Sequence, residues 1–337
     1  MVELTPKRIA EFIESFRVEP GKRVRLPRDF DPAATREQSK AEAREILEDG
    51  VGLLADYQTR LAAQDTYGVV MVLQAMDAAG KDGTISHVMS GFNPQGVQVS
   101  SFKIPSSEDL DHDYLWRYAR RLPERGNIGI FNRSYYEEVL VVRVHPQILA
   151  GEKLPPSLRR GDIWKRRFRE INDWEHYLTD QGFRFAKIFL NVSKEEQRRR
   201  FLSRIDEPEK NWKFSATDAK ERLYWDDYQK AFGEVLSNTS TSWAPWYVIP
   251  ADDKPFARVA AASVLAHTLM EINPQFPKVA PEAKAALRAA KVELEGQAPP
   301  GAALDPIELE PAQNAAEKVV KKAGKRAGKK AGKKGSR

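Results

Sequence analysis

The sequence predicts a three-layer α/β domain built around a parallel sheet, and two observations carry this prediction. Short apolar runs rich in β-branched residues alternate with longer stretches of helical periodicity, which is typical of parallel strands joined by crossover helices. Of the 337 residues, 41% are hydrophobic, so the chain can bury the core of one large domain or two small ones. The same composition excludes coiled-coil rods, collagen and wholly disordered chains.

The alternation can be followed element by element from the amino terminus. Strands are expected over residues 69–76, 97–103, 127–132, 183–192 and 246–250. Helices are expected to end near residue 63, to cover 107–121, 163–180, 193–204 and 255–272, and to begin near residue 134. The first strand is apolar except at Gln74 and does not alternate with polar residues, which favours burial on both faces. Ser193, followed three residues later by Glu196, predicts a capping box at the start of its helix.

Composition divides the chain into three segments. Residues 1–35 form a turn-rich arm, residues 36–275 hold the alternating elements, and residues 276–337 are rich in alanine and proline, then in lysine, alanine and glycine. The last 20 residues carry ten basic residues and no acidic one, so subtracting ten from the net charge of +6 leaves −4 for residues 1–317. We expect a disordered basic tail over 276–337, because such a composition buries no core.

Composition also limits the possible chemistry and location. The absence of cysteine excludes disulfide scaffolds, thiolate zinc sites and cysteine nucleophiles. No apolar run approaches the roughly 20 residues that a membrane-spanning helix needs, and the first residues lack the apolar stretch of a signal peptide. We therefore expect a cytoplasmic protein with no membrane partner. Because the excess positive charge is confined to the tail, the basic isoelectric point does not by itself indicate nucleic-acid binding.

A candidate phosphate-binding loop follows the first expected strand. Residues 75–84 lie where a strand turns into a helix, which is the setting that such loops require. Gly80 lets the backbone approach a phosphate closely, and Lys81 places a point charge on it. Measured against the pattern G-x-x-x-x-G-K-[ST], Ala75 replaces the first glycine and Asp82 replaces the final hydroxyl residue. An ordinary strand–turn–helix corner is the alternative. The expected binding residues of the loop are Ala78, Ala79, Gly80, Asp82, Gly83 and Thr84.

Magnesium would need a substitute for the missing hydroxyl, and Asp77 and Thr84 are the candidates within the loop. A second polar segment, residues 131–137, ends another strand, and ligands of parallel α/β sheets bind at the carboxyl ends of strands. Arg133 can clamp a phosphate with its planar fork, and a carboxylate or amide nearby can position magnesium directly or through water. The alternative is a turn capped by Ser134 with packed tyrosines.

Arginine is abundant in the body of the chain despite its negative net charge. The clusters contain Arg159, Arg160, Lys165, Arg166, Arg167, Arg169, Arg198, Arg199, Arg200 and Arg204. Segregated positive charge suits a polyanionic ligand, although a solvated face paired with acids is the alternative for each arginine. Residues 205–218 follow these arginines and are expected to form a lid whose cations close over phosphate and whose aromatic rings stack on a base. A plain surface hairpin is the alternative there.

With these segments in order, the sequence resembles the polyphosphate kinase 2 family, whose members move phosphate between inorganic polyphosphate and nucleotides. The resemblance runs from about residue 16 to residue 270 and rests on residues 73–85, 113–117, 131–137, 208–214 and 244–250. It implies a P-loop kinase fold with a helical lid, and Asp82 is normal for this family. Family analogy also implies a homo-oligomer.

The segments and the resemblance together assign residues to roles. Catalytic roles fall on Asp77, Lys81, Asn132, Arg133 and Glu137. Beyond the loop, phosphate and nucleotide binding falls on Arg117, Arg198, Arg200, Arg204, Lys210, Trp212 and Lys213. Mg²⁺, with Mn²⁺ as a substitute, would be held by Asp77 and Glu137, in part through water. The family's usual Asp-Arg pair reads Asn132-Arg133 here, which resembles the subgroup that accepts AMP as well as ADP.

The expected function is therefore magnesium-dependent, reversible phosphoryl transfer from inorganic polyphosphate to ADP, and also to AMP. One alternative is an ATP-dependent nucleotide kinase of the same fold, which the loop alone does not exclude. A second alternative is a protein that binds nucleic acid or another polyanion, because a lysine-rich tail binds any polyanion by counterion release.

Overall fold

The computed structural model describes residues 6–34, 40–159 and 161–297. The chain divides into two units, of which the first ends at Pro277 and the second begins at Lys278. Within the described ranges, none of the helices combines the length and the apolar character that crossing a membrane requires. The lysine-, alanine- and glycine-rich end of the predicted disordered tail lies outside the described residues.

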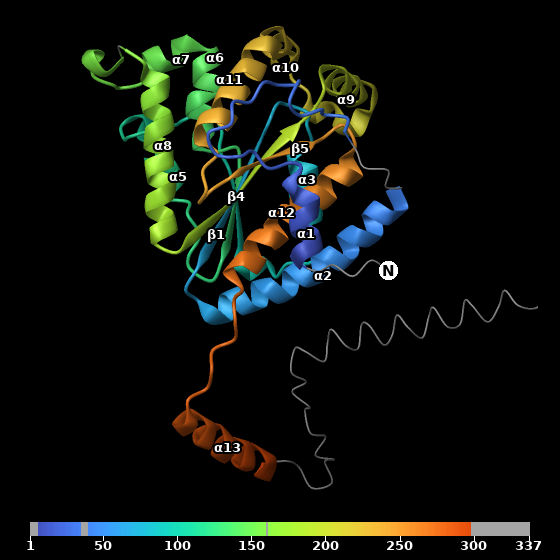
Figure 1. The fold of residues 1–337 in the computed structure, drawn as a ribbon, viewed down its shortest axis with the longest axis vertical. Helices are drawn as coiled ribbons and strands as arrows, with labels where there is room; N and C mark the ends of the chain where they lie inside the picture. Colours follow the sequence, from blue (N-terminus) through green and yellow to red (C-terminus); the bar gives the residue numbers. More distant parts are fainter. Residues whose placement is uncertain (1–5, 35–39, 160, 298–337) are drawn as a thin grey trace, which may run out of the picture. The chain divides into compact units, whose positions relative to one another are not determined.

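A five-stranded parallel sheet forms the centre of the first unit (Figure 1). Its strands are β1 (Gly68–Ala75), β2 (Val97–Ser101), β3 (Ile128–Asn132), β4 (Phe183–Asn191) and β5 (Trp246–Pro250). They lie in the order β2-β3-β1-β4-β5, and every neighbouring pair is parallel. The predicted parallel sheet is confirmed, and the strand bounds differ from the expected ones by no more than two residues. Strand β1 is buried along almost its whole length, as its continuous apolar run predicted.

Helices cover both faces of this sheet and complete the three layers. One face is covered by α12 (Lys254–Ile272), which packs against α1 (Pro6–Glu14), α2 (Lys40–Gln64) and α3 (Lys81–Val88) (Figure 1). The other face is covered by α8 (Ile163–Asp180) and α11 (Trp225–Thr239). The remaining elements of this unit are α4 (Ser107–Leu110), α5 (Trp116–Ala119), α6 (Val141–Val144), α7 (Pro146–Gly151), α9 (Lys194–Asp206) and α10 (Ala216–Glu221), with the 3-10 turns η1 (Pro94–Gly96), η2 (Tyr135–Val139), η3 (Pro156–Arg159), η4 (Pro208–Lys213) and η5 (Arg222–Tyr224).

The core of the first unit contains a fully buried ion pair. Lys187 of β4 donates from Nζ to Glu175 Oε2 at 2.7 Å and to Thr239 O at 2.7 Å. The hydroxyls of Tyr135 and Tyr136 donate to Glu175 Oε1 at 2.6 and 2.8 Å. Both charged side chains are 0% exposed. Charges at this depth are tolerated only when they are paired and hydrogen-bonded, and this network meets that condition.

The amino-terminal arm packs onto the domain as part of the same unit. The ring of Phe16 meets the ring of Phe256 edge to face, with centroids 5.9 Å apart. The backbone then runs beside β5, where Val18 N donates to Trp246 O at 2.8 Å and Val248 N donates to Phe16 O at 2.7 Å. The arm therefore covers the outer edge of β5, whose backbone groups would otherwise lack partners.

Two predicted helices are shorter than expected. Residues 107–121 form only α4 and α5, because the Asp113 carboxylate accepts from Leu115 N at 2.9 Å and turns the chain between them. After β3, Ser134 caps the 3-10 turn η2 instead of a long helix, accepting from Tyr136 N at 3.3 Å. Pro146 begins α7 and cannot extend α6, since proline has no backbone N–H.

The predicted capping box of α9 is half present. Ser193 Oγ accepts from Glu196 N at 3.1 Å, as the sequence pattern predicted. The reciprocal bond is replaced, because the Glu196 carboxylate accepts from Arg200 Nε at 2.8 Å and Asp252 Oδ1 accepts from Ser193 N at 2.8 Å. The helix start is thereby tied to the residues that follow β5.

The second unit contains a helix, α13 (Pro281–Gly296), within its described residues. The prediction of disorder from residue 276 is therefore wrong for this stretch. Alanine, leucine, glutamate and lysine dominate it and have high helix propensity, and Pro281 occupies the first helical position, where a missing N–H costs nothing. None of its side chains is buried, so the helix rests on propensity rather than on packing.

Candidate active site

The predicted phosphate-binding loop connects β1 to α3. Gly80 has a φ of +110°, a left-handed conformation that glycine adopts without steric cost. Thr84 N donates to Gly80 O at 3.0 Å and closes the first turn of α3. The amino end of α3 therefore follows the loop directly, and the unpaired N–H groups of a helix start favour an anion. The predicted binding residues Ala78, Ala79, Gly80, Asp82, Gly83 and Thr84 all lie in this loop or in the first turn of α3.

Lys81 begins α3 and folds its side chain back over the loop. Its Nζ donates to Ala75 O at 2.9 Å and to Met76 O at 3.3 Å. Burial, followed by the nearby charge of Arg133, lowers the pKa of Lys81 to about 8. The loop carbonyls thus hold a partly desolvated cation beside the helix start, where an anion would bind.

The neighbouring strand β3 places Arg133 beside the loop. Leu73 of β1 pairs with Asn132 of β3, and Arg133 N donates to Leu73 O at 3.1 Å. Arg133 Nη2 donates to Asp77 Oδ1 at 2.9 Å, and its Nη1 donates to Glu137 Oε2 at 3.3 Å. The Glu137 carboxylate and that of Asp77 raise the pKa of Arg133. The structure therefore brings together the predicted residues Asp77, Arg133 and Glu137.

Asn132, the last residue of β3, binds a residue of the phosphate-binding loop. Its Nδ2 donates to Asp82 Oδ1 at 2.8 Å and so ties the end of β3 to the first turn of α3. The two departures, Asp82 from the general loop pattern and Asn132 from the family's Asp-Arg pair, therefore meet in one hydrogen bond. An aspartate at 132 would face Asp82 as a second carboxylate, and two such groups repel unless a cation or a proton lies between them.

Arg200 lies beneath the loop rather than in the binding space. Its Nη1 donates to Ala78 O at 3.1 Å and to Ala79 O at 2.7 Å. Its Nη2 donates to Ala251 O at 2.6 Å and to Asp252 O at 3.1 Å. With 6% of its surface exposed, Arg200 cannot bind a phosphate without breaking these bonds. We interpret it as a positioning residue that holds the loop backbone, in place of the predicted phosphate-binding role.

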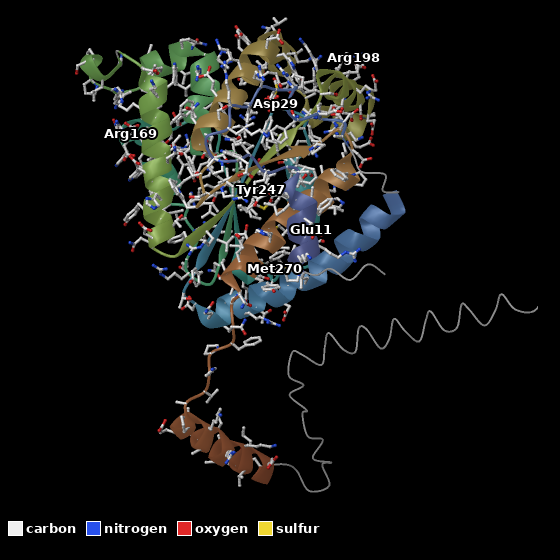
Figure 2. All side chains as sticks on the ribbon, viewed as in Figure 1. Glu11, Asp29, Arg169, Arg198, Tyr247 and Met270 are labelled. Carbon is white, nitrogen blue, oxygen red and sulfur yellow. The ribbon has the colours of Figure 1, made fainter. Side chains whose placement is uncertain are left out.

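The other predicted arginines of α9 lie on two different faces. Arg204 follows Arg200 by about one turn, and its Nη1 lies 3.6 Å from Asp218 Oδ2 of the lid. Arg198 instead forms a two-pronged pair with Glu195, at 2.7 and 2.9 Å, and its side chain is 53% exposed; Figure 2 marks its place on α9. Arg204 is therefore on the face that meets the site, and Arg198 is not.

The predicted lid over 205–218 is helical, with η4 and α10 covering most of it. Trp212 is 78% exposed, and Lys213 Nζ lies 4.9 Å from its ring centroid. Lys210 pairs with Glu207. Among the described residues, none of the three predicted lid residues hydrogen-bonds to the phosphate-binding loop.

Arg117 is held at the end of β2. Its Nη2 donates to Lys103 O at 2.8 Å, and its guanidinium lies over the rings of Phe102 and Tyr118 at 5.6 and 5.4 Å. These contacts fix the side chain beside β2, which is the neighbour of β3 in the sheet. Asn132 is the last residue of β3. The predicted nucleotide-binding role of Arg117 stays a prediction.

A cavity of about 40 Å³ lies at the centre of the site. Asp77, Arg133 and Glu137 form one side of it. The other side includes four residues that the sequence analysis missed, namely Gln197, Asp218, Glu221 and Tyr228. Gln197 Nε2 donates to Asp77 O at 2.9 Å, and its position three residues before Arg200 was a helical-spacing signal. A larger cavity of about 290 Å³, between α1, α12 and β5, holds none of the predicted site residues.

Comparison with known proteins identifies the family. The family model described as "Polyphosphate kinase 2 (PPK2)" matches residues 37–277. The chain belongs to this family. An "ADP-polyphosphate phosphotransferase" from Rhodopseudomonas palustris is 52% identical over 272 residues, which cover 80% of this chain and 93% of that protein. An "AMP/ADP-polyphosphate phosphotransferase" from Meiothermus ruber is 42% identical over 268 residues, which cover 79% of this chain and 96% of that protein.

A solved structure agrees with this assignment. Polyphosphate kinase 2 from Arthrobacter aurescens superposes with a TM-score of 0.75 at 38% identity, covering 87% of this chain and 99% of that one. The α/β fold with its parallel sheet is therefore that of the polyphosphate kinase 2 family, as the resemblance implied.

The carboxylates of Asp77 and Glu137, the predicted magnesium ligands, can be compared with what a magnesium site requires. The described residues contain no cluster of three or more acidic or histidine side chains that would hold a metal by themselves. Mg²⁺ is commonly bound by one or two carboxylates together with substrate phosphates and water. Asp77 and Glu137, both partly exposed and both held by Arg133, supply that number of carboxylates. The residues present therefore fit magnesium that binds together with a substrate.

Proposed function

We propose that this chain transfers phosphoryl groups reversibly between inorganic polyphosphate and nucleoside diphosphates or monophosphates. The observation that carries the proposal is the meeting of the phosphate-binding loop with Asp77, Arg133 and Glu137 at the carboxyl ends of two adjacent parallel strands. The close relatives named as ADP- and AMP/ADP-polyphosphate phosphotransferases support it. The cytoplasmic location and the homo-oligomer stay predictions from the sequence.

The chemistry requires positioning and charge neutralisation more than covalent catalysis. Lys81 and the amino end of α3 bind the non-bridging oxygens of a donor phosphate. Arg133 moves from its carboxylate partners to the phosphoryl group in transfer, which its fork geometry suits. Asp77 orients the acceptor phosphate, which is already largely ionised near neutral pH. Asp77 and Glu137 would hold magnesium, which would supply positive charge that neutralises the phosphate oxygens during transfer.

The lid has to move before a nucleotide binds. The central cavity of about 40 Å³ has the volume of one or two water molecules, whereas sites for ligands of nucleotide size have volumes of several hundred Å³. Asp218, the last residue of the predicted lid, and Glu221, at the end of α10, line this cavity, and Asp218 lies beside Arg204. An outward movement of α10 breaks that ion pair and opens the acceptor side.

A set of parallel reactions tests the proposed function against the alternative functions. Purified protein with Mg²⁺ is given polyphosphate and, in separate reactions, AMP, ADP, GMP or GDP, and each product is measured. We expect ATP from ADP and ADP from AMP, with Asn132 favouring acceptance of AMP. A parallel series replaces polyphosphate with ATP as the donor for AMP. Transfer from ATP alone would identify a nucleotide kinase, and no transfer from either donor would contradict an enzyme of this class.

Raising the pH above about 8 is expected to weaken polyphosphate binding. The free protein loses the charge of Lys81 there, because its pKa is lowered to about 8, whereas a bound polyanion favours the charged form. The KM for polyphosphate should rise about fivefold between pH 8 and pH 9, because the charged fraction of Lys81 falls from about one half to about one tenth. In Lys81→Arg the charge persists, so the KM of that variant should stay nearly flat. An equally steep rise in both proteins would contradict the assignment to Lys81.

Truncation tests the role of the basic tail. We propose that the tail tethers polyphosphate or DNA and takes no part in catalysis, because it concentrates ten basic residues after residue 317. A chain lacking residues 280–337 is expected to keep its kcat and to lose most retention on immobilised DNA and polyphosphate. Unchanged retention of both polyanions would reject the tether, and a large loss of kcat would contradict its separation from catalysis.

A further inference from the structure

The cavity of about 290 Å³ lies at the other end of the sheet from the phosphate-binding loop. Its lining includes Arg184 and Tyr247, near the first residues of β4 and β5, and His267, in the last turns of α12. The loop follows the carboxyl end of β1, and these strands are parallel, so the two cavities lie at opposite edges of one sheet. Glu14 and Glu271 of the lining are exposed, so the cavity opens to solvent.

Two side chains of this cavity each contain a buried N–H group that lacks a partner. Arg17 Nε and Trp243 Nε1 make no hydrogen bond to any of the described residues. Both side chains are partly exposed, so a small rotation turns either group toward the cavity. Because a buried donor without an acceptor is unfavourable, a ligand that brings an acceptor to these groups gains binding energy.

The charges of the lining suit a ligand with one anionic group. Arg17 Nη1 lies 3.8 Å from Glu14 Oε2, and His267 Nδ1 lies 3.7 Å from Glu271 Oε2, both longer than a hydrogen bond. Arg184 Nη1 already donates to two backbone carbonyls, so Arg17 offers the available guanidinium. The two arginines offset the two glutamates, and the lining is close to neutral when His267 is uncharged. A long polyanion would find little excess positive charge here.

The size and the aromatic rings of the cavity indicate the rest of the ligand. Its volume of about 290 Å³ far exceeds that of a single phosphate group and approaches the range of about 300–1,000 Å³ for organic ligands. The rings of Phe185, Trp243 and Tyr247 line it. Burial raises the pKa of Tyr247 to about 12, so its hydroxyl is protonated at neutral pH and can donate a hydrogen bond. These features fit a planar ring system that carries one anionic group.

We propose that this cavity binds a nucleoside monophosphate, with its phosphate at Arg17 and its base against the rings of Trp243 and Tyr247. The guanidinium of Arg17 binds phosphate oxygens by charge-assisted hydrogen bonds. Trp243 Nε1 donates to an acceptor of the ligand. The site is separate from the acceptor position beside Asp77, so the inference goes beyond the proposed function, and binding here requires no phosphoryl transfer.

Calorimetric titration of the full-length protein with AMP tests the proposal. Arg17→Gln/Trp243→Phe removes the charge and the indole N–H while keeping a side chain of similar shape at residue 17 and an aromatic ring at residue 243. The wild-type protein is expected to bind one AMP more per chain than this variant, whose kcat with polyphosphate and AMP should stay within about twofold. The matched control is Arg169→Gln, at an exposed arginine of α8 (Figure 2), and it should bind as many AMP molecules as the wild-type protein.

A second titration and a crystal soak test the two halves of the ligand. Adenosine is expected to bind the cavity at least about tenfold more weakly than AMP, because it lacks the charged group that Arg17 binds. Crystals of the wild-type protein soaked with AMP brominated on the base should show the anomalous signal of bromine beside Trp243, whether or not the variant folds.

Three results would overturn the inference. The first is an equal number of bound AMP molecules in the wild-type protein and in Arg17→Gln/Trp243→Phe. The second is equal affinity of the cavity for adenosine and AMP. The third is a bromine signal confined to the site beside the phosphate-binding loop. Absence of transfer from polyphosphate by the wild-type protein would refute the proposed function and not this inference.

Discussion

Replacing Asp77 with asparagine is expected to lower kcat for phosphoryl transfer by about a thousandfold. Asp77 is one of two carboxylates that hold Arg133, and it is one of the two that would hold magnesium. Asparagine keeps the size and an acceptor oxygen but removes the charge. The loss should therefore appear in turnover rather than in folding, and steady-state kinetics with polyphosphate and ADP measures it.

The control for this variant is Asp227→Asn, at an exposed acid of α11 outside the site. It should keep kcat within about twofold of the wild-type protein, since surface changes away from special features have small effects. Equal Tm values for the three proteins would show that the fold is intact. An Asp77→Asn protein with near-full activity would refute the assignment of Asp77.

Breaking the buried ion pair is expected to have the largest effect on stability. Lys187→Met leaves Glu175 as an uncompensated charge in the core and should lower the free energy of unfolding by about 3–5 kcal/mol. Lys187→Met/Glu175→Gln should be more stable than the single variant, because a neutral amide still accepts from the hydroxyls of Tyr135 and Tyr136. Urea unfolding measures both values.

An exposed lysine provides the matched comparison. Lys230→Met makes the same chemical change at the surface of α11 and should alter the free energy of unfolding by less than about 0.5 kcal/mol. Two results would contradict a stabilising role of the buried network. In one, Lys187→Met lowers the free energy of unfolding as little as Lys230→Met does. In the other, the double variant is less stable than Lys187→Met.

The sheet and the loop could be predicted because local sequence determines them. The apolar run at 69–76 and the glycine and lysine after it specify a buried strand, a tight turn and a helix start in consecutive residues. The carboxyl ends of parallel strands meet at one edge, so Asp77 and Arg133 could be expected near each other without knowledge of the strand order. Glu137, also a predicted site residue, contacts Arg133 in the same cluster.

The other features of the candidate site could not be predicted, because they depend on contacts between residues that are distant in the sequence. Arg200 was predicted to bind phosphate because it lies on an arginine-rich helix, but its side chain passes under the loop to the carbonyls of Ala78 and Ala251. Asp218 reaches the site from α10 and Tyr228 reaches it from α11, and the sequence alone did not show that these two helices meet the loop. Helix α13 was missed because alanine and charge, without an apolar face, were interpreted as disorder, whereas propensity alone favours a helix there.

The central claim is that a substrate phosphate binds at the start of α3. Soaking crystals of this protein with tripolyphosphate and Mg²⁺ and determining the structure tests it most directly. We expect a phosphate group on the N–H groups of Gly80 and Lys81, with Lys81 Nζ turned from the loop carbonyls toward it and Arg133 released from Asp77. Phosphate density at another surface, with Lys81 still bonded to Ala75 and Met76, would contradict this account of the site.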